Sequence, residues 1–524
     1  MVDFVALPKV LGIETEYGIL HRGVADPNPI AASSVLINAY VAEVARLAKV
    51  ASAGHQDHVG WDFEDESPGR DARGYARQGS MPPEVETHLV NAVLTNGARY
   101  YVDHAHPEYS SPECSNPLEI VRWDKAGEVI LQRSMEAAER LLPPGQSIVV
   151  YKNNSDRKGN SYGCHENYLM DRMVPFPSIV QHVTPHFVTR QIYTGAGKVG
   201  SEVPTGDLDV PFQLTQRADF FEEEVGLETT LKRPIVNTRD EPHADATKYR
   251  RLHVICGDAN LAEVSTYLKV GVTAIVLSMI EDGWFGDRDF TLAAPVRAMR
   301  QVSYDLSLAQ PLELASGATM TALEIQWELF DMARKYADDR GLECTGPAAV
   351  GEDVLRRWEQ VLHGLESEPT SLATELDWVA KHQIINGYRE RHDLRWSDAK
   401  LAAMDLQYHD LRPAKSLFAR LPMTTLVTDE DVAAATIDPP TTTRAYFRGR
   451  CLQRFAAAIA AANWDSMVFD LSPHKETLQR VPMMEPLRGT AAIVDSLFEG
   501  VSSPIELFER AGWLPRPSGD GSHG

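Results

Sequence analysis

The amino-acid sequence predicts an α+β protein in which a sheet leaves one face open to a binding site and helices pack against its other face. Two observations lead to this prediction. The candidate strands carry polar residues at alternate positions, which is the pattern of a sheet with one packed and one open face. Segments with a helical apolar period alternate with these strands. An open face argues against a doubly wound parallel sheet, whose strands are buried on both faces.

The helical period is clear in six segments, several of which end in charged residues or glycine. They are Ile30–Lys49, Asp124–Leu142, Leu261–Ile280, Thr321–Arg340, Glu352–Glu366 and Leu376–Arg391. We expect these helices to pack against the far face of the sheet.

The 524 residues exceed the roughly 250–300 at which a single core stops growing. We therefore expect a large domain over residues 1–435, a small C-terminal domain over 436–514 and a disordered tail over 515–524. The Pro/Thr run Pro439–Thr443 marks the boundary. Before it, Ala51–Pro83 holds five glycines, three prolines and a charged run, so we expect a long functional loop that adds little to a core.

Composition excludes several classes of function. A net charge of −23 with a pI of about 5.2 argues against nonspecific nucleic-acid binding. Five cysteines without CxxC spacing indicate neither a disulfide framework nor a zinc site, so we expect a cytoplasmic protein. The N-terminus has no basic signal-peptide region, and the apolar run Val270–Ile280 is too short for a membrane span. We therefore expect a protein that is neither secreted nor embedded in a membrane.

The first chemical signal is Gly12–Ile19, with the sequence GIETEYGI. Side chains alternate along a strand, so Glu14 and Glu16 share one face. Two adjacent carboxylates repel unless a cation joins them, and hard cations such as Mg²⁺ bind such carboxylates. The alternative is the solvated face of an edge strand.

The second signal is Arg99–Tyr109, with the sequence RYYVDHAHPEY. A strand here would place Tyr101 and Asp103 on one face beside Glu108, with Pro107 ending the strand. His104 and His106 suggest zinc, but no third N or S ligand is near, so we expect them to support the site structurally.

Further candidates are His165 and His253, each on a strand-like segment, although a lone histidine is more often a core residue. Basic residues that suit phosphate oxygens are Arg217, Lys232, Arg233 and Arg239, with local salt bridges as the alternative. The segment Thr194–Gly200 resembles a phosphate loop but has Ile192 and Val199 where that loop needs Gly and Ser or Thr. We expect a flexible turn there.

Together these segments resemble the Pup-processing family, whose members attach the small modifier protein Pup to other proteins or remove it. The resemblance runs from Gly12 to about Glu509. Its most specific segments are GIETEYG, NGARYYVDHAHPEYS, YGCHENYLM, NTRDEPHADA, YRRLHVICGDANLAE and FDLSPHKE. The chain resembles the deamidase and depupylase branch more than the ligase branch, because Ala51–Pro83 matches a loop that ligases lack and Val102–Pro107 differs from the ligase sequence.

The resemblance implies a glutamine-synthetase-like fold: a curved antiparallel sheet that cradles ATP and Mg²⁺, helices behind it and a small C-terminal domain. It implies Asp103 as the catalytic residue, acting as a covalent nucleophile or as a base. The implied metal ligands are Glu14, Glu16, Tyr101, Glu108 and His253. The implied nucleotide-binding residues are His165, Arg217 and Arg239.

The activity implied by the resemblance is ATP- and Mg²⁺-dependent hydrolysis: deamidation of the C-terminal Gln of Pup, and cleavage of the isopeptide bond between Pup and substrate lysines. Pup ligation on the same fold is the alternative, and Pup binding without catalysis is a second one. The implied partners are Pup, pupylated proteins and the proteasomal ATPase. Thr443–Arg454, which is rich in arginine, is expected to contact the nucleotide or Pup.

Overall fold

The computed structural model describes residues 6–48, 59–64, 66–74, 90–206 and 208–514. Its central element is a ten-stranded sheet in which every neighbouring pair is antiparallel except β3 with β16. In spatial order, the strands are β13 (Tyr249–Gly257), β8 (Cys164–Asp171), β1 (Leu11–Glu16), β6 (His106–Ser110), β5 (Arg99–Asp103), β4 (Asn91–Val93), β3 (Val59–Trp61), β16 (Ile459–Ala462), β17 (Ser466–Phe469) and β18 (Gln479–Pro482).

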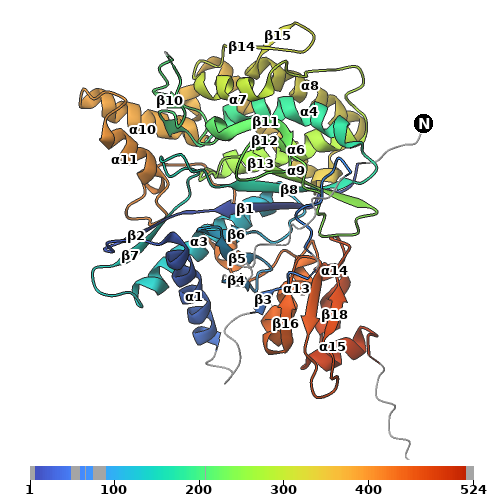
Figure 1. Cartoon of the computed structure of the whole chain (residues 1–524). Coiled ribbons are helices and arrows are strands. Elements are labelled where there is room, and N and C mark those ends of the chain that lie inside the picture. Colours follow the sequence, from blue (N-terminus) through green and yellow to red (C-terminus); the bar gives the residue numbers. More distant parts are fainter. Residues whose placement is uncertain (1–5, 49–58, 65, 75–89, 207, 515–524) are drawn as a thin grey trace, which may run out of the picture.

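Helices cover one face of this sheet, and the α+β architecture is confirmed. Helices α3 (Pro117–Glu139) and α6 (Glu263–Glu281) contact strands β1 and β8, and α1 (Pro29–Ala48) contacts β5 and β6. A further layer lies behind α6 and consists of α4 (Phe176–Thr189), α7 (Pro295–Tyr304), α8 (Ala322–Arg340) and α9 (Ala348–Ser367). Figure 1 shows this layer above β13 and β8.

The six predicted helices are all present. Five agree closely with the predicted bounds, but α3 begins at Pro117 rather than near Asp124. The start is fixed by Asn116, whose side chain accepts a hydrogen bond from Glu119 N at 3.0 Å, and by Pro117 in the first turn. Both are standard signals of a helix start.

Two helices are long and apolar enough to cross a membrane by length and composition alone. They are Pro29–Leu47, with a mean hydropathy of 1.3, and Glu263–Glu281, with 1.4. Val270–Ile280 alone was expected to be too short for a membrane span, but the whole helix that contains it is long enough, so that expectation is wrong for the helix. That helix, α6, is completely buried inside the protein, so its apolar composition is that of a core helix.

The C-terminal strands extend the main sheet. Strand β3 pairs with β4 on one side and with β16 on the other. Val59 and Trp61 of β3 are buried in a separate core with residues of the C-terminal region. The insert Ala51–Pro83 was expected to add little to a core, and its described residues 59–64 and 66–74 correct that expectation. The predicted tail 515–524 lies outside the described residues.

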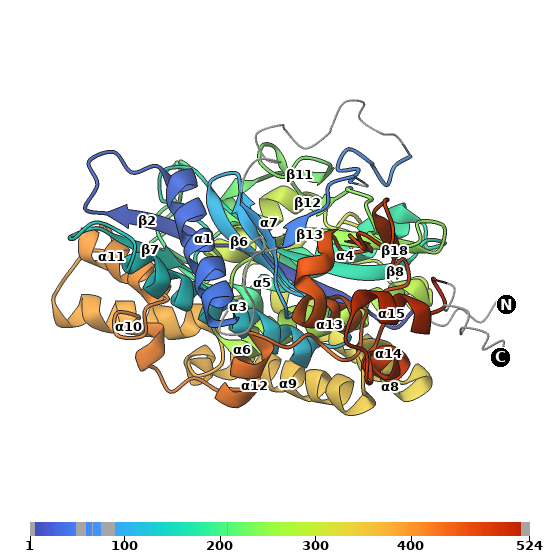
Figure 2. The ribbon, with the colours of Figure 1, turned by 90° about the horizontal axis from the view of Figure 1, so that it is seen from below.

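Ion pairs hold the start of helix α13 (Ala445–Phe455) against Glu113, which lies between β6 and α3. Arg444 Nε donates to Glu113 Oε1 at 2.8 Å, and Arg448 forms a second ion pair with the same carboxylate. All three side chains are mostly buried. Figure 2 shows α13 with α14 (Ala491–Val494) and α15 (Pro504–Arg510) on the side of the molecule opposite to α10 (Asp377–Arg391) and α11 (Ala399–Tyr408).

Strands β5 and β6 form a tight hairpin, which corrects the expectation that Pro107 ends a strand. Pro107 lies inside β6 opposite Val102. Val102 N donates to Val90 O at 3.0 Å, on the side away from β6. The Val102–Pro107 pair therefore exchanges no hydrogen bond between β5 and β6, and the missing N–H of Pro107 costs none. A proline fits a strand at such a position. The turn residue His104 has a φ of 49°.

Candidate active site

The register of the strands places the candidate residues in rows across the open face. Glu16 of β1 stands opposite Glu108 of β6, and Glu108 stands opposite Tyr101 of β5. Glu14 stands opposite His165 of β8. Directly opposed side chains in antiparallel strands are close neighbours, so the sheet gathers residues that lie far apart in the sequence.

Two groups of side chains bring ligand atoms within 4.8 Å of one another: Glu14 with His165 and His253, and Glu16 with Asp103 and Glu108. Tyr101 joins the second group, because its hydroxyl donates to Glu108 Oε1 at 2.6 Å. All predicted metal ligands and the predicted catalytic residue therefore lie on one face of the sheet.

Asn167 orients the first group. Its Nδ2 donates to Glu14 Oε1 at 2.9 Å, and its Oδ1 lies 3.0 Å from His253 Nδ1. Since an amide oxygen only accepts, His253 carries its proton on Nδ1 and keeps the Nε2 lone pair for a ligand. Arg251 Nη1 also donates to Asn167 Oδ1, at 2.8 Å. Such supporting hydrogen bonds fix the orientation of a metal-binding histidine.

The second group carries an excess of negative charge. Burial raises the pKa of Glu108 well above its ordinary value, and the charges of Asp103, Glu16 and Glu14 raise it further. Burial also opposes ionisation of Glu16, but a hydrogen bond from His106, the charge of His165 and the Gly163 amide hold its pKa at about 2. Carboxylates crowded in this way fit a divalent cation, which would relieve their repulsion.

Asp103 lies at the turn end of the β5–β6 hairpin, where it is paired with His106. Its side chain is 27% exposed, so a substrate can reach it, and its Oδ2 lies 3.0 Å from His104 Nδ1. The turn that follows is held against α1 by a hydrogen bond from Ser33 Oγ to Ala105 O at 2.9 Å. Asp103 is thus the accessible carboxylate of the second group. His106 lies beside Glu16, with 3.5 Å between His106 Nδ1 and Glu16 Oε2.

Arginines without a carboxylate partner lie near this cluster. Arg217 is 1% exposed, and its guanidinium donates to Ser161 Oγ at 3.2 Å and to the carbonyl of Ile255. Arg233 Nη2 donates to Ser161 O at 2.8 Å. Burial lowers the pKa of both, and Arg217 adds to the shift of Arg233. Among the described residues neither forms an ion pair, and a buried unpaired guanidinium calls for an anion.

Arg239 is the other predicted arginine. Its backbone pairs with that of Asp71 of the insert in an isolated antiparallel β-bridge. Its buried Nε has no hydrogen-bond partner within the described ranges. Burial lowers the pKa of both His253 and Arg251, and the charge of Arg239 lowers both further, so Arg239 borders the first group. The segment Thr194–Gly200 is not a phosphate loop, because Lys198 is buried and paired with Glu202 at 2.7 Å.

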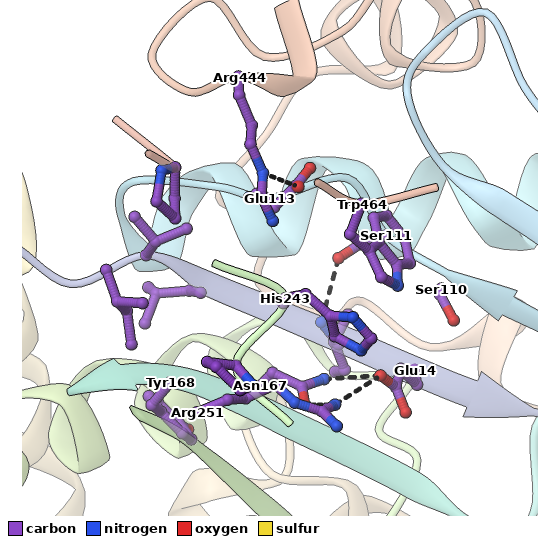
Figure 3. A pocket seen from close by; sticks show the side chains of 17 residues that line it. Glu14, Ser110, Ser111, Glu113, Asn167, Tyr168, His243, Arg251, Arg444 and Trp464 are labelled. Carbon is purple, nitrogen blue, oxygen red and sulfur yellow. Dashed lines mark hydrogen bonds and ion pairs between the residues drawn. The ribbon is translucent and has the colours of Figure 1, made fainter. Parts of the chain in front are cut away.

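A mainly apolar cleft lies beside Glu14, between β1 and the C-terminal region. Figure 3 shows His243, Trp464 and Arg444 around it, with Glu14 and Asn167 at one end. Arg444, from the segment predicted to contact the nucleotide or Pup, is the ion-pair partner of Glu113 and lines this cleft. An aromatic and apolar cleft next to cation and anion sites suits the base of a nucleotide.

Asn167 and Arg251 are site residues that were not predicted from the sequence. A signal was present, since Asn167 follows His165 by two residues and Arg251 precedes His253 by two. Residues two apart on a strand share a face. Applying the strand period outward from each histidine would have found both.

A face of an antiparallel sheet that gathers carboxylates, imidazoles and a phenol, bordered by unpaired arginines and an apolar cleft, is the site of an enzyme. Comparisons with known proteins give the family. The profile of the family described as Pup-ligase protein matches residues 9–468, and the chain belongs to this family.

Two relatives match nearly the whole chain. The depupylase of Acidothermus cellulolyticus is 53% identical, covering 95% of this chain and 98% of the relative. The Pup deamidase/depupylase of Mycobacterium tuberculosis is 49% identical, covering 97% and 100%. Among solved structures, the Pup ligase PafA in complex with ADP has a TM-score of 0.72 and 35% identity, covering 88% of this chain and 98% of the ligase. The predicted fold is confirmed.

Proposed function

We propose that this chain is a hydrolase that acts on carbon–nitrogen bonds at the C-terminal residue of Pup. It would deamidate a C-terminal Gln to Glu and cleave the isopeptide bond between Pup and substrate lysines. The observation that carries the proposal is the accessible Asp103 beside the buried pair Glu16 and Glu108. The high identity to proteins named depupylase and Pup deamidase/depupylase supports hydrolysis.

We further propose ATP and Mg²⁺ as cofactors. Nucleotide binding is supported by the ADP complex of the related ligase and by the cleft beside Glu14. Glu14, Glu16, Tyr101, Glu108 and His253 would hold the cation, while His165, Arg217 and Arg239 would face phosphate oxygens. When bound, the cation would supply positive charge that stabilises the developing oxyanion. The phosphates would supply a fixed negatively charged surface against which the substrate amide is aligned.

Asp103 can act in two ways. As a nucleophile, one of its oxygens attacks the amide carbon, the C–N bond breaks, the leaving nitrogen takes a proton, and water then hydrolyses the anhydride to release the acid and restore Asp103. As a base, Asp103 takes a proton from the water that attacks the same carbon and passes it to the leaving nitrogen as the C–N bond breaks. Hydrolysis of an amide is downhill, so neither route requires ATP to be consumed.

The deciding experiment is ammonia release from Pup ending in Gln, measured with and without Mg²⁺-ATP. We expect release that depends on both cofactors, and cleavage of a Pup–protein conjugate under the same conditions. In a parallel reaction, Pup ending in Glu and a target protein are incubated with Mg²⁺-ATP. Robust conjugate formation there would show the ligase alternative, and bound nucleotide with no ammonia release would show binding without catalysis.

We also propose a cytoplasmic location, which is supported by the absence of disulfides among the described residues: Cys114, Cys164, Cys256, Cys344 and Cys451 are all free thiols. The proteasomal ATPase is a further proposed partner, supported only by the family resemblance. Co-purification of the two proteins, with an unrelated cytoplasmic ATPase as the control, tests that partnership.

A further inference from the structure

A second cavity, of about 300 Å³, lies at the other end of the carboxylate row from the apolar cleft. Its wall begins at Gly18, two residues beyond Glu16, and includes Tyr162 and residues of α11. The Tyr162 ring lies 4.3 Å from the ring of His106, which contacts Glu16. The cavity is therefore adjacent to the second ligand group, on the α11 side of the molecule seen in Figure 2.

The lining of this cavity carries charges of both signs. Among the lining residues are three cations, Arg157, Lys158 and Lys198, and two anions, Asp156 and Asp405. Asp405 is already matched by two cations, since it forms ion pairs with Arg157 at 3.0 Å and with the buried Lys381 at 2.8 Å. Lys198 is paired with Glu202 at 2.7 Å, so Lys158 is the lining cation without an ion pair among the described residues, and its charge favours an anionic ligand.

Arg157 is held in place by the protein. It adopts a φ of 60°, a region that residues other than glycine rarely occupy. Its Nη1 donates to Asp405, and its Nη2 donates to Val199 O at 2.9 Å. Its neighbour Lys158 is exposed, and within the described part of the chain its ammonium forms no ion pair. The loop therefore presents a fixed guanidinium and an available ammonium to the cavity.

A buried donor without a partner is the second observation. His409 is 1% exposed and lines the cavity. Its Nε2 faces two donors, Lys381 Nζ at 2.6 Å and Gln216 Nε2 at 2.7 Å, so Nε2 accepts and the ring proton lies on Nδ1. That Nδ1 is buried and has no hydrogen-bond partner in the described residues. The backbone of Lys152 also faces the His409 ring, but no hydrogen bond of full geometry reaches Nδ1 among the described residues, although buried donors are nearly always satisfied.

We propose that this cavity binds the free α-carboxylate of the C-terminal residue of Pup, through His409 Nδ1 and the cations Arg157 and Lys158. The inference rests on the proposed function. A Gln whose side-chain amide is cleaved, and which ends the chain, must carry a free α-carboxylate a few bonds from the reacting carbon. Binding that carboxylate next to the second group would align the side-chain amide with Asp103 and exclude glutamines inside a chain.

The test compares two forms of Pup, one ending in Gln with a free α-carboxylate and one ending in Gln α-carboxamide. We expect kcat/KM of the free protein to favour the carboxylate by roughly 10- to 100-fold, mainly through KM, which is the range for a hydrogen bond to a charged group. Ammonia release from neither form would contradict the proposed function itself. Equal kcat/KM for the two forms would overturn this inference alone.

Two variants locate the subsite. His409→Gln keeps an acceptor for Lys381 but loses the Nδ1 donor, and Lys158→Ala removes an exposed cation without disturbing the core. Each should lower kcat/KM for the carboxylate form and leave the carboxamide form unchanged. Lys335→Ala, an exposed cation on α8, changes the net charge equally and should have no effect. Unchanged discrimination in both Lys158→Ala and His409→Gln would place the carboxylate elsewhere.

A binding measurement separates recognition from catalysis. The affinity of the product form, Pup ending in Glu, is measured by fluorescence anisotropy against its α-carboxamide. We expect the free acid to bind more tightly to the wild type, and this preference to shrink in Lys158→Ala. Equal affinities of the wild-type protein for acid and carboxamide would contradict the subsite even if hydrolysis proved undetectable.

Discussion

The ion pairs of Glu113 allow a quantitative prediction, because the carboxylate is enclosed by two arginines. Its side chain is 13% exposed, against 4% for Arg444 and 0% for Arg448. Burial disfavours the ionised form, but the charges and hydrogen bonds of Arg448 and Arg444 outweigh burial and lower the pKa of Glu113 from 4.5 to about 2. At about 1.4 kcal/mol for each pH unit, this difference corresponds to about 3 kcal/mol of folding free energy at neutral pH.

The perturbation is Glu113→Gln, which keeps the shape of the side chain and removes its charge. We expect a loss of about 3–5 kcal/mol at pH 7, because two buried guanidinium groups lose their partner. The folded-state pKa lies below the unfolded value, so the stabilisation is present above pH 4.5 and disappears as the pH falls through 2. The difference between wild type and variant should shrink over that interval.

The assay is urea unfolding of both proteins at several values between pH 7 and pH 2.5. Glu43→Gln is the matched control, because Glu43 forms only surface ion pairs with Arg46 and Arg140, which contribute little. A difference at pH 7 no larger than that of the control would refute the reasoning, and so would a difference that does not change with pH. Since Arg444 and Glu113 line the apolar cleft, we also expect Glu113→Gln to raise the KM for ATP.

Two further predictions concern the active site, and a third concerns strand β3. Asp103→Asn should keep nucleotide binding but lose both cleavage activities by at least about 10²–10⁴-fold; near-normal ammonia release would remove Asp103 from the mechanism. Glu108→Gln should shift the Mg²⁺ activation curve to higher concentrations, and an unchanged curve would exclude Glu108 as a ligand. Trp61→Ala should destabilise the protein by about 3–5 kcal/mol in urea unfolding, because Trp61 is buried and stacks on Arg99 at 4.0 Å; wild-type stability would show that β3 is dispensable.

The last of these revises what the sequence suggested for the insert. From composition alone, deleting Ala51–Pro83 should leave folding intact. The structure places Val59 and Trp61 between β4 and β16, so we expect the deletion to lower the melting temperature. No local pattern reveals this role, because three residues are too short for a strand period and the partner strand lies some four hundred residues away.

The active site was largely predictable because its residues lie on strands. Alternation along β1 placed Glu14 and Glu16 on one face, and the same rule placed Tyr101 with Asp103. The pairing of these strands was not predictable, since the register that sets Glu16 opposite Glu108 depends on the order β8-β1-β6-β5. Arg233 had only a general basic signal, and its proximity to Arg217 arises from loops that meet at Ser161.

The role of His409 could not be predicted from the sequence, because it depends on residues that only the fold brings to its ring. His409 lies in the segment DLQYHD, which contributes to the family resemblance, but no periodicity or charge pattern singles it out there. Its significance comes from Lys381 and Gln216, which fix the ring proton on Nδ1, and from the cavity that His409 lines. The two cavities lie at opposite ends of the row containing Glu14 and Glu16, with the C-terminal region beside one and α11 beside the other. A nucleotide and a peptide terminus could therefore approach Asp103 from opposite sides, and the acid-versus-carboxamide comparison decides whether the terminus enters beside α11.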